Sequence, residues 1–171
     1  DIEFGAIKIG MLHSSEVIAA VANKLEQYGM NNIVLDPVMV ATSGDNLLVN
    51  DAISSLKYFL PKARLITPNI PEAEKLIGYP IELKGLKNSA REIGRLYSTS
   101  VLLKGGHIGS HENEITDTLY MYENDEIITI KNSWVNTKNT HGTGCSLSSS
   151  IAAFLSLGYT LEDAVRKGCY Y

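Results

Sequence analysis

The sequence lacks the features that mark several large classes of protein. No Gly-x-x-x-x-Gly-Lys-Ser/Thr segment occurs, so the chain is not a P-loop protein. No apolar run approaches the ~20 residues that a membrane-spanning helix requires, so we expect no membrane partner. The chain carries 15 Lys and Arg against 19 Asp and Glu, without a basic cluster, which argues against a nucleic acid partner.

Cysteine is also scarce. The two cysteines, Cys145 and Cys169, show neither the spacing of metal ligands nor that of a disulfide framework, and a reducing, cytoplasmic location fits this usage. Repeats, linkers and low-complexity segments are absent, so we expect residues 1–171 to form a single domain. The apolar fraction of 44% is ordinary for a chain that buries a hydrophobic core.

Predicted strands and helices alternate along the sequence. Short apolar runs typical of buried strands lie at 6–9, 33–36, 65–67 and 101–104. Apolar residues at helical spacing between them predict helices that begin near residues 15, 50, 71 and 86. Two β-rich runs, 118–122 and 126–130, predict a hairpin. This order predicts a layered α/β fold with a mostly parallel sheet and an antiparallel edge hairpin.

The most informative stretch is the heptapeptide Asn-Thr-His-Gly-Thr-Gly-Cys at 139–145. Gly142 and Gly144 predict a turn that leads into a helix of small and apolar residues. The first N–H groups of such a helix suit an anion, above all a phosphate oxygen, and the helix dipole adds positive charge there. Cys145 lies in this turn, where a thiolate is favoured. Leu147 replaces the third glycine of a dinucleotide fingerprint, so phosphoryl transfer is the preferred interpretation.

Further candidate site residues lie just after the predicted strands, where ligands bind in sheets of this kind. They are Met11, Asp36 with Val38, Asn69 with Glu72, and Lys104. Each also has a structural interpretation. Asp36 could end a strand, Glu72 could be an ordinary acid of a first helical turn, and Met11 is more often a core residue. Lys104 could be solvated, although the two glycines after it let a ligand approach closely.

The full heptapeptide resembles the carboxy-terminal signature of the ribokinase-like superfamily, in its hydroxymethylpyrimidine/phosphomethylpyrimidine kinase branch of thiamin biosynthesis. Most of that superfamily has an Asp that acts as catalytic base at the end of the Gly-x-Gly turn. The pyrimidine kinases and a related group of pyridoxal kinases carry Cys there, as this chain does at Cys145. The resemblance implies a three-layer ribokinase-like fold and covers nearly all of the chain.

The resemblance also implies roles for the candidate residues. Met11 and Val38 would bind the substrate ring, and Cys145 would act as the base beside an anion hole formed by Gly142, Thr143 and Gly144. The remaining roles concern ATP and Mg²⁺. Lys104, Asp36, Asn69 and Thr140 would bind the ATP phosphates, while Glu72, through water, and Asp36, as a second candidate, would hold the metal. Asp117 is similar to an acid that follows the Lys104 segment in the family.

We therefore expect a kinase that uses ATP and Mg²⁺ to phosphorylate 4-amino-5-hydroxymethyl-2-methylpyrimidine, its monophosphate, or both. A pyridoxal or pyridoxine kinase of the Cys-bearing type is the main alternative. A hydrolase or transferase with Cys145 and either His107 or His141 as a nucleophilic dyad is a second alternative, and a non-catalytic pyrimidine-binding module is a third. A homodimer is one of the assemblies open to such a protein.

Two departures from the family pattern affect these expectations. Thr42 stands where many relatives have Lys, which removes one phosphate contact. The amino-terminal βαβ unit of the family and the end of its last helix have no counterpart in the sequence. We therefore expect the 171 residues to be a fragment of a longer kinase domain.

Overall fold

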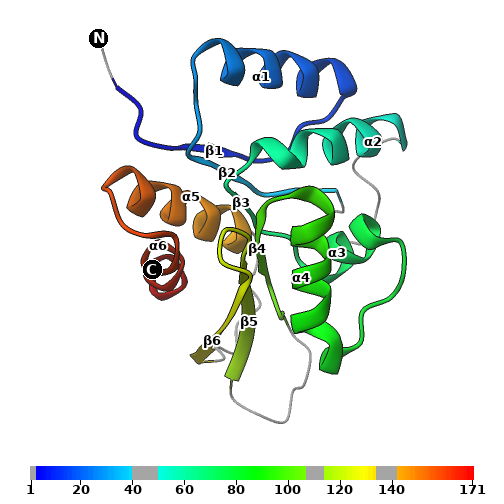
Figure 1. Cartoon of the computed structure of the whole chain (residues 1–171), viewed down its shortest axis with the longest axis vertical. Coiled ribbons are helices and arrows are strands. Elements are labelled where there is room, and N and C mark those ends of the chain that lie inside the picture. The colour runs from blue at the N-terminus through cyan, green and yellow to red at the C-terminus, as the bar shows by residue number, and fades with distance from the viewer. Residues whose placement is uncertain (1–2, 40–49, 107–113, 134–141) are drawn as a thin grey trace.

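One sheet runs through the molecule, and helices cover both of its faces (Figure 1). The computed structural model describes residues 3–39, 50–106, 114–133 and 142–171. The sheet follows the sequence order: β1 (Ile7–Ile9), β2 (Ile33–Leu35), β3 (Leu65–Ile66), β4 (Ser100–Leu103), β5 (Glu114–Met121) and β6 (Glu126–Ser133). The pairs from β1 to β4 are parallel, whereas β4–β5 and β5–β6 are antiparallel.

The helices form the two outer layers of this part of the chain. One face carries α1 (Ser15–Gln27), α2 (Asn50–Phe59), α3 (Ile70–Ile77) and α4 (Leu86–Tyr97), and the other carries α5 (Thr143–Ser156) and α6 (Leu161–Tyr170). Short 3₁₀ segments lie at Leu60–Lys62 and Leu83–Gly85. The sheet separates two hydrophobic cores, one under each helical layer. Among the described helices, none is long and apolar enough to cross a membrane.

Strand β2 shows why the buried strands of this sheet appear in the sequence as unbroken apolar runs. Ile33 and Leu35 belong to the core under α1 to α4, and Val34 belongs to the core under α5 and α6. Because both faces of the strand are covered, neither has a solvent side that would select polar residues. The first polar residue after this run, Asp36, therefore falls at the carboxyl edge of the sheet.

The helix ends follow the capping residues that the sequence offers. Ser14 caps α1 by accepting a hydrogen bond from the Val17 N–H (3.3 Å), and Thr160 caps α6 by accepting one from the Asp163 N–H (3.2 Å). Gly142 precedes α5 with a φ of 83°, a left-handed conformation that glycine adopts without strain. The expected glycine turn into a helix is confirmed.

The layered α/β fold with an antiparallel edge is confirmed too, but the hairpin is longer than predicted. Strand β5 begins at Glu114 rather than 118, and β6 ends at Ser133 rather than 130. The added residues include Glu114 and Lys131, whose side chains form an exposed ion pair at 2.9 Å. Polar residues at the open end of a hairpin lack the apolar pattern on which the strand prediction depends.

Candidate active site

The carboxyl ends of three neighbouring strands bring a buried ion pair together. Asp36 follows β2, and only 2% of it is exposed. Its Oδ1 atom accepts a hydrogen bond from the Thr67 hydroxyl (3.0 Å) and pairs with the Lys104 ammonium (3.1 Å). Thr67 follows β3 and Lys104 follows β4, so each of these three strands supplies one polar group. Sequence reasoning gave Thr67 no role, although a hydroxyl at the end of an apolar run was an available signal.

The first turn of α5 lies against this ion pair. A Cβ atom added to Gly144 would lie 3.1 Å from the Lys104 Nζ and 3.6 Å from the Asp36 Oδ2. Any side chain at this position would therefore compete with the ammonium for space. Helix N-termini direct partial positive charge outward, so an anion bound here would meet the turn and the lysine together.

Asn69 and Glu72 lie at the start of α3, beside the same edge. The Asn69 Oδ1 accepts a hydrogen bond from the Glu72 N–H (2.9 Å), and the Glu72 Oε2 accepts one from the Asn69 N–H (2.8 Å). This reciprocal pair is a capping box. The backbone of Asn69 also bridges to Lys104 in parallel fashion, which connects the start of α3 to the ion pair. The Asn-x-x-Glu spacing was a signal for this cap, but sequence reasoning assigned Asn69 to phosphate binding and Glu72 to the metal or to an ordinary first helical turn.

The electrostatic setting of Glu72 is unusual for a carboxyl. The residue is 3% exposed, and its pKa is raised from 4.5 to about 7. Burial is the largest cause, and the Asp36 carboxylate raises the pKa further. The Asn69 N–H and the Lys104 ammonium act in the opposite direction. Glu72 therefore changes its charge near neutral pH, where enzymes most often use ionisable groups.

Asp117 on β5 holds the backbone that follows Lys104. Its buried carboxylate accepts a hydrogen bond from the Gly105 N–H (2.8 Å), and burial raises its pKa. A Cβ atom on Gly105 would lie 1.8 Å from the Thr116 carbonyl oxygen, so only glycine fits so close to β5. Asp117 therefore fixes the turn from the neighbouring strand, a contact that the sequence pattern did not indicate.

The remaining predicted residues are less closely joined. Cys145 is exposed in the first turn of α5, next to Gly144. Met11 lies two residues after β1 and is 49% exposed, so its interpretation as a core residue is wrong. Val38 lies three residues after β2 and is half-buried. Thr140 falls outside the described residues.

The donor atoms at this edge suit a hard cation such as Mg²⁺. Asp36 and Glu72 contribute carboxylate oxygens and Asn69 an amide, and Mg²⁺ prefers oxygen ligands. Within the described residues, no group of three or more His, Cys, Asp or Glu side chains is arranged to hold a metal. Magnesium is commonly held by one or two carboxylates together with substrate phosphates and water, and the residues present fit that arrangement.

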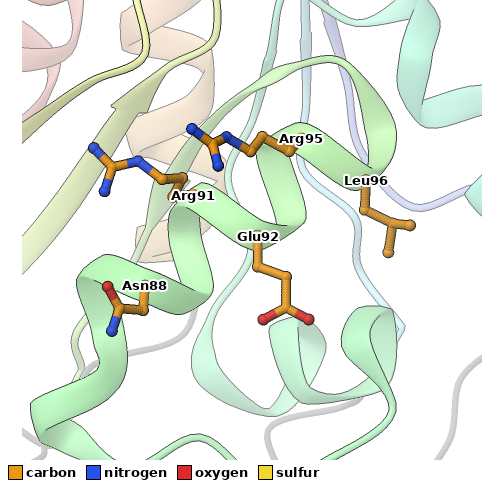
Figure 2. A pocket seen from close by; sticks show the side chains of 5 residues that line it. All are labelled: Asn88, Arg91, Glu92, Arg95 and Leu96. Carbon is orange, nitrogen blue, oxygen red and sulfur yellow. The ribbon is translucent and has the colours of Figure 1, made fainter.

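Two hollows on the surface do not include these residues. One lies on α4 and is lined by Asn88, Arg91, Glu92, Arg95 and Leu96 (Figure 2). The other lies between α1 and β1, with Phe4, Ile7, Val21 and Tyr28 among its lining residues. Neither hollow is lined by any of the candidate site residues that the sequence predicts, so the carboxyl edge remains the candidate active site.

Comparison with known proteins agrees with this geometry. The family model described as phosphomethylpyrimidine kinase matches residues 1–171. The chain belongs to the phosphomethylpyrimidine kinase family. It is 37% identical over 166 residues to the hydroxymethylpyrimidine/phosphomethylpyrimidine kinase of Bacillus subtilis. The aligned region covers 96% of this chain and 60% of that protein. The chain therefore spans only part of the length of this relative.

Solved structures of phosphomethylpyrimidine kinases and pyridoxal kinases resemble the chain. The crystal structure of phosphomethylpyrimidine kinase from Clostridium difficile 630 has a TM-score of 0.81 and 38% identity, over 100% of this chain and 68% of that one. The structure of the pyridoxal kinase of Staphylococcus aureus in complex with AMP-PCP and pyridoxal has a TM-score of 0.81 and 27% identity, over 96% of this chain and 58% of that one. The expected three-layer ribokinase-like fold is confirmed.

Proposed function

We propose that this chain carries most of the active site of an ATP- and Mg²⁺-dependent kinase that phosphorylates 4-amino-5-hydroxymethyl-2-methylpyrimidine, its monophosphate, or both, in thiamin biosynthesis. The observation that supports this most directly is the position of Gly144, where a Cβ atom would lie 3.1 Å from the Lys104 Nζ and 3.6 Å from the Asp36 Oδ2. It brings a helix N-terminus, a lysine and a carboxylate to one point, which suits the phosphates of a nucleotide.

Phosphoryl transfer requires in-line positioning and neutralisation of the charge on the transferred group. In our proposal, Lys104 exchanges its contact with Asp36 for one with the phosphate oxygens of ATP. The backbone N–H groups of Gly142 to Cys145 form the anion hole for the transferred phosphoryl group. Thr140, from the same heptapeptide, completes the phosphate contacts.

The metal belongs to the same proposal. Magnesium, when bound, supplies positive charge to the phosphate oxygens. Asp36 would hold it directly, and Glu72 would hold it through water, with Asn69 on the phosphates. Because a nearby cation favours the charged form of a carboxyl, Glu72 would lose its proton as the metal binds.

On the acceptor side, Met11 and Val38 follow the neighbouring strands β1 and β2 and would contact the substrate ring. The likeness to the Staphylococcus aureus pyridoxal kinase keeps pyridoxal as a second candidate acceptor. Steady-state assays of the full-length protein with ATP and each acceptor separate the two. A kcat/KM for pyridoxal that equals or exceeds that for the pyrimidine would overturn the preferred substrate.

Cys145 is the proposed base for the acceptor hydroxyl. We expect Cys145→Ser to lose most turnover, ~10²-fold or more, because a serine hydroxyl is not ionised near neutral pH. Cys145→Asp should recover part of it, and the acidic limb of its pH–rate profile should move to lower pH. If both variants keep substantial activity, the residue acts only through its backbone N–H. A trapped covalent adduct on the wild-type thiol would instead identify a nucleophile.

A further inference from the structure

Lys8 lies in the middle of β1 and faces the layer of α5. In the parallel register it is the partner of Val34 on β2, and Val34 belongs to the core under α5 and α6. Partners in register point to the same face of a sheet. Asp36, two residues after Val34, shares that face, because its Oδ2 would lie 3.6 Å from a Cβ atom added to Gly144 of α5. Lys8 is half-buried there.

The ammonium of Lys8 is directed toward the carboxyl edge. A Cβ atom on Gly10 would lie 2.7 Å from the Lys8 Nζ. The Lys8 side chain therefore extends over Gly10 and occupies the space that a side chain on Gly10 would take. Gly10 lies beside Asp36 on the neighbouring strand, because the Asp36 N–H donates to the Ile9 carbonyl (2.9 Å). Neighbouring strands are about 4.8 Å apart. Asp36 thus has Lys8 on the β1 side and Lys104 on the β4 side.

The two lysines differ in what they contact. Lys104 pairs with Asp36 at 3.1 Å. For Lys8, the residues that the structure describes provide no ion pair and no side-chain hydrogen bond. A half-buried ammonium has given up part of its hydration, and an anion that binds beside it restores that loss. The position of Lys8 therefore suits an anionic group of a ligand.

We infer that Lys8 binds the phosphate of a phosphorylated acceptor, and so determines whether the enzyme uses a monophosphate ester as well as the free alcohol. This inference rests on the proposed kinase function. Met11, the proposed contact of the substrate ring, follows β1 directly, so a cation on β1 lies on the acceptor side of Asp36. A monophosphate brings a charge of about −1.5 to −2 to an edge that already holds Asp36 and Glu72. A second cation offsets this charge, which the free alcohol does not carry.

The chemistry of the two acceptors differs in the same way. With the monophosphate, a phosphate oxygen attacks the γ-phosphorus of ATP, the bond from that phosphorus to the bridging oxygen breaks, and ADP leaves with its electron pair. The products are the diphosphate ester and ADP, and a fully ionised phosphate has no proton to lose. The alcohol must give up a proton, for which Cys145 is the proposed base. Lys8 and Cys145 should therefore affect the two reactions unequally.

The test compares both acceptors in the full-length protein. We expect Lys8→Gln to raise KM for the monophosphate by ~10- to 100-fold and to lower kcat/KM for the alcohol by less than about threefold, because only the monophosphate loses a charge-assisted contact. Lys8→Arg should restore most of the affinity. Lys24→Gln, on the exposed surface of α1, is the matched control for loss of one lysine. Thermal unfolding of each variant checks its folding.

Equal losses for the two acceptors would overturn the assignment, since a merely structural role would impair both reactions. An unchanged KM for the monophosphate would overturn it too. Calorimetric titration of the monophosphate without ATP gives a second readout: the wild type should bind more tightly than Lys8→Gln, and the difference should shrink at high salt. If the wild type phosphorylates neither acceptor, the proposed function fails, and the same titration still decides whether Lys8 binds phosphate.

Discussion

The buried ion pair of Asp36 and Lys104 contrasts with an exposed cluster around Asp125. In the buried pair the side chains are 3% and 17% exposed, whereas Asp125 and Arg95 are 49% and 61% exposed. Arg95 donates two hydrogen bonds to the Asp125 carboxylate, at 3.2 and 2.8 Å, and the Tyr120 hydroxyl donates a third at 2.9 Å. Arg91 and Arg95 extend from α4 in one direction, while Glu92 extends in another (Figure 2).

The contrast distinguishes the exposed cluster, which stabilises the fold, from the buried pair, for which we propose a role in phosphate binding. The exposed cluster ties the turn between β5 and β6 to α4, but its charges remain solvated and are screened by salt. Burying Asp36 and Lys104 removes two charges from water, and a hydrophobic pair of similar volume would often be at least as stable. Stability alone therefore gives little reason for the buried pair, whereas phosphate binding gives a direct one.

Among the variants that test this contrast between the two clusters, Lys104→Met should have the largest effect. The substitution leaves the Asp36 carboxylate buried without its cation, so we expect the free energy of unfolding to fall by about 3–5 kcal/mol. Urea unfolding at neutral pH measures this loss. The matched control is the double variant Lys104→Met/Asp36→Asn, which keeps an acceptor for Thr67 and should regain much of the stability. A single variant as stable as the wild type would mean that the pair is effectively solvated.

The pH dependence of stability in Glu72→Gln provides a second test of how burial affects the charges at this edge. Because the fold raises the pKa of Glu72 from 4.5 to about 7, the folded protein holds this proton more tightly than the unfolded chain. The stabilisation is complete below pH 4.5 and is lost as the pH rises through 7. Glutamine does not titrate, yet it can keep the capping box. From pH 4.5 to 8, the variant should gain up to about 3 kcal/mol of unfolding free energy relative to the wild type.

The same variant tests the metal role of Glu72. Turnover at saturating ATP should fall by ~10²-fold, because a charged group is lost from the transition state. A Mg²⁺ titration of the initial rate shows whether the metal requirement changes with it. Unaltered turnover across that titration would remove Glu72 from the site and leave it only its cap on α3.

Asp125→Asn is expected to have the smallest effect. Its carboxylate is exposed, and hydrogen bonds from Arg95 and the Tyr120 hydroxyl lower its pKa. We expect the midpoint of thermal unfolding to fall by no more than about 3 °C, and by less at 1 M salt. Asn124→Ala, at the adjacent position of the turn, is a suitable control. A loss as large as that of Lys104→Met would erase the distinction between the two clusters.

The sequence was sufficient to predict the layered fold and the edge at which the candidate residues gather. Both follow from apolar runs such as 33–35, because a strand that is covered on both faces allows no polar residue until it ends. Asp36 and Lys104 could therefore be located at strand ends without coordinates. The Gly142-x-Gly144 turn likewise predicted the start of α5, since a left-handed residue before a helix favours glycine.

The contacts among these residues could not be predicted in this way. Whether Asp36 meets Lys104, Thr67 or a solvent molecule depends on the pairing of β2, β3 and β4, which no local pattern specifies. The bond from Gly105 to Asp117 likewise depends on an antiparallel register between distant segments. The assigned role of Thr140 stays a prediction, because that residue lies outside the described part of the chain.

The reciprocal hydrogen bonds between Asn69 and Glu72 make the first turn of α3 a reporter of the charge at this edge. An ionised carboxylate accepts a stronger hydrogen bond from the Asn69 N–H than a protonated carboxyl does. The exchange of that amide hydrogen with solvent, corrected for its intrinsic rate, should slow as Glu72 ionises. Isotope exchange at one backbone atom could therefore follow the proton of a buried side chain, without a substrate and without an attached probe.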